Sequence, residues 1–206
     1  GPGTFINNAG NANPGLLTIN DGTYRGVTQA GAISAGGVTA NKGTLEVASD
    51  TSTTFTNTAT TINGDFTLKP DRATSGSGAV LTQTIGTVTL NNAATLTVAA
   101  GANVTTAPIT LSTGAVTLGA TDATINTSGP LTALTLASIT GAGNNLTLTG
   151  DGNTAVTGAI TTGTGTLIKE GSGNLTLNGA NTFTGLTTVN AGTLTLGQAT
   201  NTFAAT

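Results

Sequence analysis

The chain has 206 residues, of which 6% are charged, and its formal net charge is −3. It contains no His, Cys, Met or Trp, which excludes the usual zinc, haem and iron–sulfur sites and the cysteine and Ser–His–Asp nucleophiles. Its five basic residues cannot neutralise a run of phosphates, so nucleic acid is not an expected partner.

The ends of the chain carry two further expectations. No apolar run approaches the length of a membrane span, and no signal peptide is recognisable, so we expect no membrane insertion by this segment. Gly1-Pro2 is interpreted as the scar of a cleaved tag, which sets residues 1–3 aside and leaves 4–206 as one predicted domain. The sequence stops at Thr206 just after a repeat, so we expect a fragment of a longer protein.

Threonine dominates the chain, with 50 residues, and apolar residues alternate with it in short triplets. Period-2 alternation of this kind is typical of a half-buried strand, with the apolar residue inward and threonine outward. Because the apolar residues are so regularly placed, we do not expect disorder. The triplets predict strands, in chain order, at Leu17–Ile19, Leu45–Val47, Val88–Leu90, Leu96–Val98, Ile109–Leu111, Val116–Leu118, Leu134–Leu136, Leu146–Leu148, Leu175–Leu177 and Leu194–Leu196.

Helix is not expected anywhere, since few windows lack Gly, Thr, Asn or Pro. Two all-β architectures remain, a hairpin sandwich or barrel and a β-solenoid. The strands are shorter than hairpin sheets prefer, which favours the solenoid, where each coil pairs with the next.

Spacing also favours the solenoid. Equivalent apolar residues recur near every 20 positions: Leu90 to Leu111, Val98 to Leu118, Leu148 to Ile168, Ile168 to Val189 and Leu177 to Leu196. The predicted fold is all-β, a right-handed single-stranded parallel β-helix with about nine or ten coils of roughly 20 residues. The register between residues 49 and 87 stays open. Stacked coils also explain the missing charge, because a buried charge would face a dry core.

One stretch resembles a known family. Residues 165–197 place Lys169 before Gly171-Ser-Gly173, then Leu175-Thr-Leu177 and Gly179-Ala-Asn181-Thr-Phe183-Thr-Gly185, and finally Asn190-Ala-Gly192-Thr-Leu194. This pattern resembles the autotransporter-associated β-strand repeat, also called the passenger-associated transport repeat. Asn174 and Leu186 depart mildly from it, and Asn41–Val47 is a weaker echo of Asn190–Leu196.

The resemblance implies a parallel β-helix in the passenger of a type V secretion protein on the bacterial surface. It carries over no catalytic residue. From the residues themselves, we expect Phe183 to fill a coil corner and the repeat's glycines to allow its turns. The residues expected to stack in the core are Leu167, Leu175, Leu177, Val189, Leu194 and Leu196.

The densest charged group is Asp65, Lys69, Asp71 and Arg72. Because Pro70 interrupts the strand pattern, we expect these residues on a protruding loop, as a solvated surface ion pair rather than an active site. A polysaccharide-acting enzyme would need a carboxylate cluster, and this group is the only candidate for one.

Three other patterns have simpler interpretations. Asn63-Gly64-Asp65 and Asp151-Gly152-Asn153 could offer oxygens to Ca²⁺, but turn formation is the expected role. Lys169-Glu170 is interpreted as an exposed turn pair. Thr-x-Thr pairs, as in Thr53–Thr56, Thr58–Thr60 and Thr87–Thr89, suggest an ice binder, but coil length varies and we expect no such pair to recur at one position.

No aromatic platform for carbohydrate is expected, and neither is a catalytic, cofactor-binding or metal site, or a bound cofactor. The predicted function is a structural stalk or passenger segment that supports adhesion, surface display and secretion at the bacterial surface. The alternatives are a subunit of a self-assembling extracellular filament or surface layer and, less favoured, a polysaccharide-acting enzyme. Expected partners are neighbouring coils, copies of the same protein, and host-cell or matrix surfaces.

Overall fold

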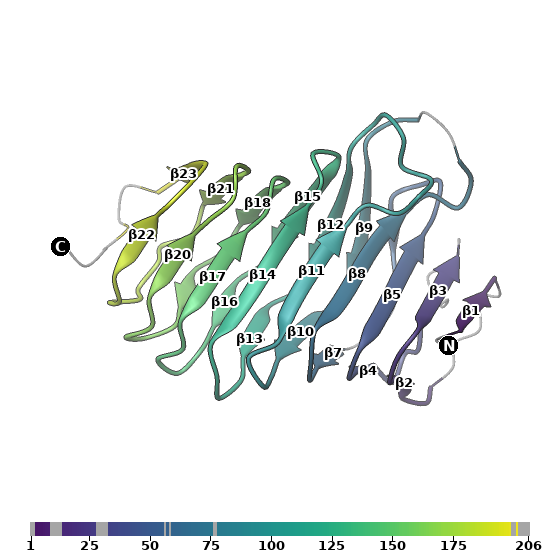
Figure 1. Ribbon diagram of the computed structural model, residues 1–206, viewed down its shortest axis with the longest axis horizontal. Helices are drawn as coiled ribbons and strands as arrows, with labels where there is room; N and C mark the ends of the chain where they lie inside the picture. The colour runs from purple at the N-terminus through teal and green to yellow at the C-terminus, as the bar shows by residue number, and fades with distance from the viewer. Residues whose placement is uncertain are drawn as a thin grey trace.

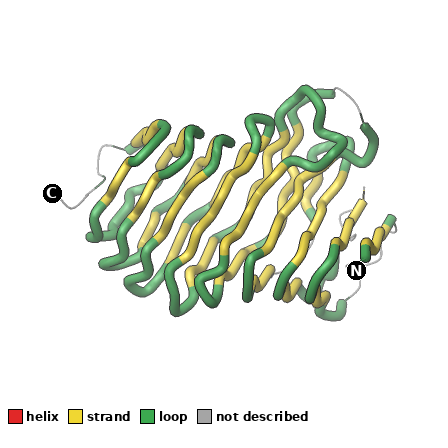
Figure 2. Tube along the Cα trace, viewed as in Figure 1, coloured by secondary structure: helices red, strands yellow, loops and turns green. Residues whose placement is uncertain are grey.

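The computed structural model describes residues 3–8, 14–27, 33–55, 57, 59–75, 78–198 and 201. Every regular element in these residues is a β-strand, joined by turns and loops (Figure 2). No helix of the described residues is long and apolar enough to cross a membrane.

The strands form three sheets, and every strand pair is parallel. Sheet A contains β1 (Thr4–Asn7), β3 (Thr23–Val27), β5 (Gly43–Ala48), β8 (Phe66–Asp71), β11 (Thr95–Ala99), β14 (Ala123–Ser128), β17 (Leu146–Thr149), β20 (Leu167–Lys169) and β22 (Thr187–Val189). Sheet B contains β2 (Leu17–Ile19), β4 (Val38–Ala40), β7 (Ala59–Ile62), β10 (Thr87–Leu90), β13 (Val116–Leu118), β16 (Ile139–Thr140) and β19 (Ile160–Thr161). Sheet C contains β6 (Thr53–Thr54), β9 (Leu81–Ile85), β12 (Ile109–Thr113), β15 (Thr132–Leu136), β18 (Asn153–Val156), β21 (Asn174–Leu177) and β23 (Thr193–Leu196).

From β5 to β20 each coil passes from sheet A to sheet C, then to sheet B, and returns to sheet A one strand further along. In Figure 1 the strands of sheet A run upward at the front while the chain advances from the N-terminus at the right to the C-terminus at the left. Rising in front while advancing to the left describes a right-handed coil. The predicted parallel β-helix is therefore confirmed.

All ten predicted triplets lie within strands, and alternation sets their burial as expected, except in the last triplet, Leu194–Leu196, where Leu196 is exposed. In β12, for example, Ile109 and Leu111 are buried while Thr110 is partly exposed. The inward residues stack into one core cluster that runs from Ile19 to Phe183. Burial of this continuous apolar column is the main stabilising contribution to the fold.

Coil length varies more than the sequence spacing suggests. Thr23 pairs with Thr44, 21 residues on, but Phe66 pairs with Leu96, 30 residues on. The spacing prediction is right for Leu177 and Leu196, and one residue out for Leu148, which pairs with Lys169. It is also one residue out for Ile168, which pairs with Thr188. It is wrong for the remaining two spacings, because Leu90 and Leu111, like Val98 and Leu118, lie in different sheets.

The extra residues of the long coils lie between sheet A and sheet C. Residues 72–75 and 78–80 follow β8, residues 100–108 follow β11, and they form the bulky loops at the upper right of Figure 1. Under them, Val104 packs with Leu81 and Ile109 in a small second cluster. Sheet B receives no insertion of this kind, and its register continues unbroken through these coils.

Candidate functional site

The predicted charged loop is a strand instead. Lys69 and Asp71 lie in β8, Asp65 lies in the turn before it, and Arg72 follows it directly. Pro70 does not interrupt the strand: it is buried, pairs with Val47, and its carbonyl accepts a hydrogen bond from the Gly101 N–H at 2.9 Å. Since Pro70 is the penultimate residue of β8, its missing N–H removes little from the ladder.

A charged cluster, here defined as Arg25, Glu46, Asp71, Arg72 and Asn103, lies over the outer face of sheet A. Arg25 and Glu46 are register partners on β3 and β5, and Lys69 is the next residue in that column. Arg25 Nε donates to Glu46 Oε1 at 2.6 Å, and its Nη2 reaches Asp71 Oδ2 at 3.3 Å. One guanidinium therefore joins three successive coils.

The loops of the long coils cover this cluster. The Asn103 N–H donates to Asp71 Oδ1 at 3.0 Å, and Asn103 Nδ2 donates to the Arg72 carbonyl at 2.9 Å. Arg72 is buried: its Nη2 donates to the Ala79 carbonyl, while its Nε has no hydrogen-bond partner among the described residues. The Asp71 side chain is only 2% exposed. A carboxyl group so buried is poorly placed to meet a substrate, and its contacts tie the loops to the sheet.

Burial and the neighbouring Glu46 carboxyl together raise the pKa of Asp71 to about 6. Two carboxyl groups in contact favour a state in which one of them is protonated. Burial disfavours the charged form of Arg25 and by itself would lower its pKa. The hydrogen bond and the charge of Glu46 outweigh this effect, so the pKa of Arg25 is raised. The folded cluster is therefore most stable when the Asp71 carboxyl group is protonated.

We expect the free energy of unfolding to fall as the pH rises through about 6. Asp71 binds its proton more tightly in the folded chain than in the unfolded chain, so its contribution is complete at acid pH and is lost above the folded pKa. The loss amounts to about 2 kcal/mol between pH 4.5 and 7.5. Urea unfolding across this range measures it, and Asp71→Asn should flatten the profile.

Asp50 serves as the control for that experiment. The pKa of Asp50 is lowered: burial by itself would raise it, but hydrogen bonds from the Thr74 backbone and side chain outweigh that effect. Asp50→Asn should therefore leave the profile above pH 4.5 unchanged. An Asp71→Asn profile as steep as that of the unsubstituted chain would contradict the assignment.

The two loops considered for Ca²⁺ use their side-chain oxygens in hydrogen bonds between coils. Asp65 Oδ1 accepts the Thr95 N–H at 2.9 Å, and Asp151 Oδ1 accepts the Gly129 N–H at 2.6 Å. Asn63 bonds to asparagines of the coils on both sides. Within the described ranges, no three His, Cys, Asp or Glu side chains gather as metal ligands would.

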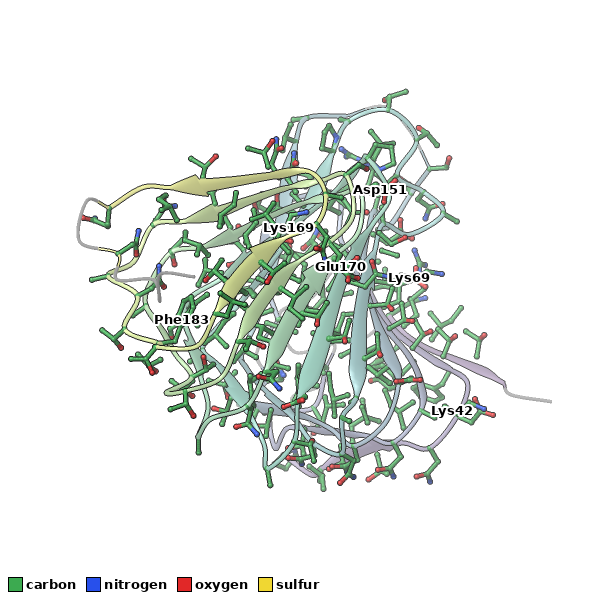
Figure 3. The ribbon with its side chains drawn as sticks, turned by 60° about the vertical axis from the view of Figure 1, so that its left-hand side comes forward. Lys42, Lys69, Asp151, Lys169, Glu170 and Phe183 are labelled. Atoms are coloured by element: carbon green, nitrogen blue, oxygen red, sulfur yellow. The ribbon has the colours of Figure 1, made fainter. Side chains whose placement is uncertain are left out.

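Lys169 is not an exposed turn residue, which corrects the sequence interpretation. It points inward from β20 and is 3% exposed. Its Nζ donates to three carbonyls, those of Glu170 at 2.6 Å, Gly171 at 2.8 Å and Ala191 at 3.2 Å. Burial lowers its pKa. Glu170 beside it is exposed, as expected (Figure 3).

We expect Lys169→Met to lower the free energy of unfolding by about 1–3 kcal/mol, because three turn carbonyls lose their donor. Thermal or urea unfolding measures the change. The matched control is Glu170→Gln, an exposed neighbour whose substitution should shift stability by less than about 0.5 kcal/mol. Equal stabilities of the Met variant and the control would show that the ammonium is dispensable.

The core of the repeat at 165–197 is partly as expected. Leu167, Leu175, Leu177 and Phe183 are buried. The last coil departs from the prediction: Val189 and Leu196 are 47% and 43% exposed, and Leu194 is partly buried. Their strands β22 and β23 are the last in sheets A and C, so among the described residues no further strand covers them.

The glycines of the repeat act in two ways. Gly171 and Gly192 have φ of +71°, as a left-handed turn requires. Gly173, Gly179 and Gly185 instead allow close approach, since a Cβ there would clash with the backbone of the preceding coil. The weaker echo is not equivalent in space, because Gly43 opens a strand of sheet A whereas Gly192 precedes β23 of sheet C.

Two groupings are absent from the sequence interpretation. The first is the charged cluster, which includes Arg25, Glu46 and Asn103. Arg25, Glu46 and Lys69 are spaced by 21 and 23 residues, and this near-coil spacing could have revealed that Arg25 and Glu46 are neighbours. The second is the pair of Phe5 and Tyr24, which stack with ring centroids 5.3 Å apart.

Comparison with known proteins gives one match. Residues 167–196 match the family model of the passenger-associated-transport-repeat. No curated protein and no solved structure matches. The match coincides with the segment whose buried Lys169, close-packed glycines and Phe183 have just been described. The chain therefore carries, at residues 167–196, a passenger-associated transport repeat, the repeat of autotransporter passengers.

Proposed function

We propose that this chain is a structural segment of an autotransporter-like passenger, a stiff stalk that supports adhesion or display at the bacterial surface and assists secretion. We propose that it acts without enzymatic activity. The observation that carries the proposal is the passenger-associated-transport-repeat match at residues 167–196. Within the family, this repeat points to a secreted, surface-exposed location.

The fold and composition support the same role. A parallel solenoid is a one-dimensional stack of coils, so it can act as a spacer that holds an attached segment at a distance from the cell surface. The absence of cysteine removes premature disulfides that would hinder passage of an unfolded chain. The best-formed charged cluster ties loops to the sheet rather than opening toward a ligand.

The test is export from a Gram-negative host, with the chain fused between a signal peptide and a known autotransporter barrel. Surface exposure is scored by protease accessibility on intact cells. Deleting residues 167–186 removes one coil from the repeat, and deleting residues 146–166 removes the preceding coil, each in register. We expect export of the full chain, a loss with the first deletion, and little change with the second.

The two outcomes that count against the proposal are distinct. Failure of the full chain to reach the surface would reject the passenger role. Equal export of both deletion variants would reject a specific contribution of the repeat to secretion.

A self-assembling filament is the second candidate. It is supported by the exposed apolar side chains of the last described coil, those of Leu186, Val189 and Leu196. Light scattering and negative-stain images across protein concentrations test it. We expect a filament-forming chain to lose assembly on Val189→Lys, and a monomer at all concentrations would reject the filament.

A further inference from the structure

Sheet B carries a threonine ladder, which we define as Thr18, Thr39, Thr61, Thr89, Thr117, Thr140 and Thr161. Each is the register partner of the next, so the ladder has one threonine on every strand of the sheet. All seven are exposed or partly exposed. In these strands a Thr-x-Thr pair occurs at Thr87 and Thr89 alone, so the expectation that no such pair recurs at one position is confirmed for sheet B. A single threonine does recur, because the long insertions, residues 72–75, 78–80 and 100–108, lie at another corner of the coil.

An asparagine ladder runs beside it, formed by Asn20, Asn41, Asn63 and Asn91, each two residues after a ladder threonine. Each amide donates to the oxygen of the preceding one: Asn41 to Asn20 at 2.8 Å, Asn63 to Asn41 at 3.0 Å, and Asn91 to Asn63 at 3.0 Å. These bonds fix the amide positions. At Gly119 the column ends, since a Cβ there would meet the Asn91 side chain.

This face also differs in charge from sheet A. The ladder strands and their asparagines contain no Asp, Glu, Lys or Arg, while sheet A bears Arg25, Glu46, Lys69 and Asp71. An uncharged surface complements an uncharged partner. None of the exposed large apolar side chains lies in these strands, so there is little to drive association of two copies.

Regularity selects the partner. Rungs of a parallel sheet repeat at about 4.8 Å, so six intervals span about 29 Å. Threonine is stiff at χ1 and offers both a hydroxyl and a methyl group, and such rigid rows hold water molecules at a fixed repeat close to that along the a axis of hexagonal ice. A glycan chain is less favoured, because these strands carry no aromatic ring for a sugar to stack on.

We propose that the threonine ladder and the adjoining asparagine ladder of sheet B form an ice-binding face. This goes beyond the proposed passenger role and does not depend on it. The ligand is the ordered surface of crystalline water, bound across the rungs of the sheet.

The test compares the 206-residue chain with two single variants in ice-recrystallisation and thermal-hysteresis assays. Thr89→Lys places a charge at the centre of the threonine ladder, on β10. Thr135→Lys is the matched control, because Thr135 is also a partly exposed outward threonine, on β15 of sheet C. We expect Thr89→Lys to lose more than half of the activity and Thr135→Lys to keep it, with circular dichroism showing both folded.

Three results would overturn the proposal. The first is no activity in the unsubstituted chain above a non-binding protein of equal size. The second is an equal loss in both variants, which would place the activity elsewhere. The third is that the unsubstituted chain shows no ice activity but sediments with insoluble neutral polysaccharide or forms dimers, and that Thr89→Lys abolishes this binding.

Discussion

Arg25→Met is expected to lower the free energy of unfolding at neutral pH by about 1–3 kcal/mol, because two partly buried carboxyl groups lose a charged hydrogen-bond donor. Arg25 bonds to both Glu46 and Asp71, whose side chains are 13% and 2% exposed. Without the guanidinium, two carboxyl groups remain in contact with no opposing charge from β3. The three coils that Arg25 joins should separate more easily.

The pH dependence distinguishes this account from a simple loss of packing. Because Asp71 carries its proton below about pH 6, the effect of Arg25→Met should shrink at pH 4.5. Adding Asp71→Asn should recover part of the stability at neutral pH. Urea unfolding of the single and double variants measures both, with exposed Lys42→Met as a control for charge alone. A loss that is the same at both pH values would rule out the charge explanation.

Phe183→Ala is expected to cost about 3–5 kcal/mol, the range for removing a buried aromatic side chain. Phe183 is fully buried, at 0% exposure, at the corner of the repeat between β21 and β22. In Figure 3 it lies well away from the Lys169 turn, so the two substitutions report on separate parts of the same coil. Removing the ring leaves a cavity that the backbone of stacked coils cannot easily close.

Leu186→Ala is the matched control, since this neighbour in the same repeat is 41% exposed. It should change stability by less than about 0.5 kcal/mol. Chemical denaturation monitored by circular dichroism measures both variants. Similar small losses for Phe183→Ala and Leu186→Ala would mean that the corner is not packed as described.

Local patterns in the sequence identified the strands because strand alternation is a local property. A triplet such as Leu175-Thr-Leu177 has the same inward and outward residues whichever strand lies beside it. The fold class followed from the shortness and number of these triplets. The repeat was also recognisable, because its lysine, glycines and Phe183 occur at fixed spacing within one coil.

Pairing between coils could not be predicted in the same way. The partner of a residue depends on how many residues the intervening corners contain, and Phe66 to Leu96 takes nine more than Thr23 to Thr44. An error of one residue reverses inward and outward positions. Lys169 shows the consequence: it pairs with Leu148 rather than lying beyond it, so it points into the core.

By itself, the sequence determined that the chain is an all-β solenoid without the residue types for the usual zinc, haem, iron–sulfur, thiol or histidine chemistry, and that residues 167–196 carry a transport repeat. Only the tertiary structure decided which side chains meet across coils. It brought Arg25, Glu46 and Asp71 together from three coils and aligned seven threonines on sheet B. The physical reason is that the alternation of inward and outward side chains depends only on the residues of each strand, whereas the pairing register between coils depends on loop lengths and on packing of the whole stack.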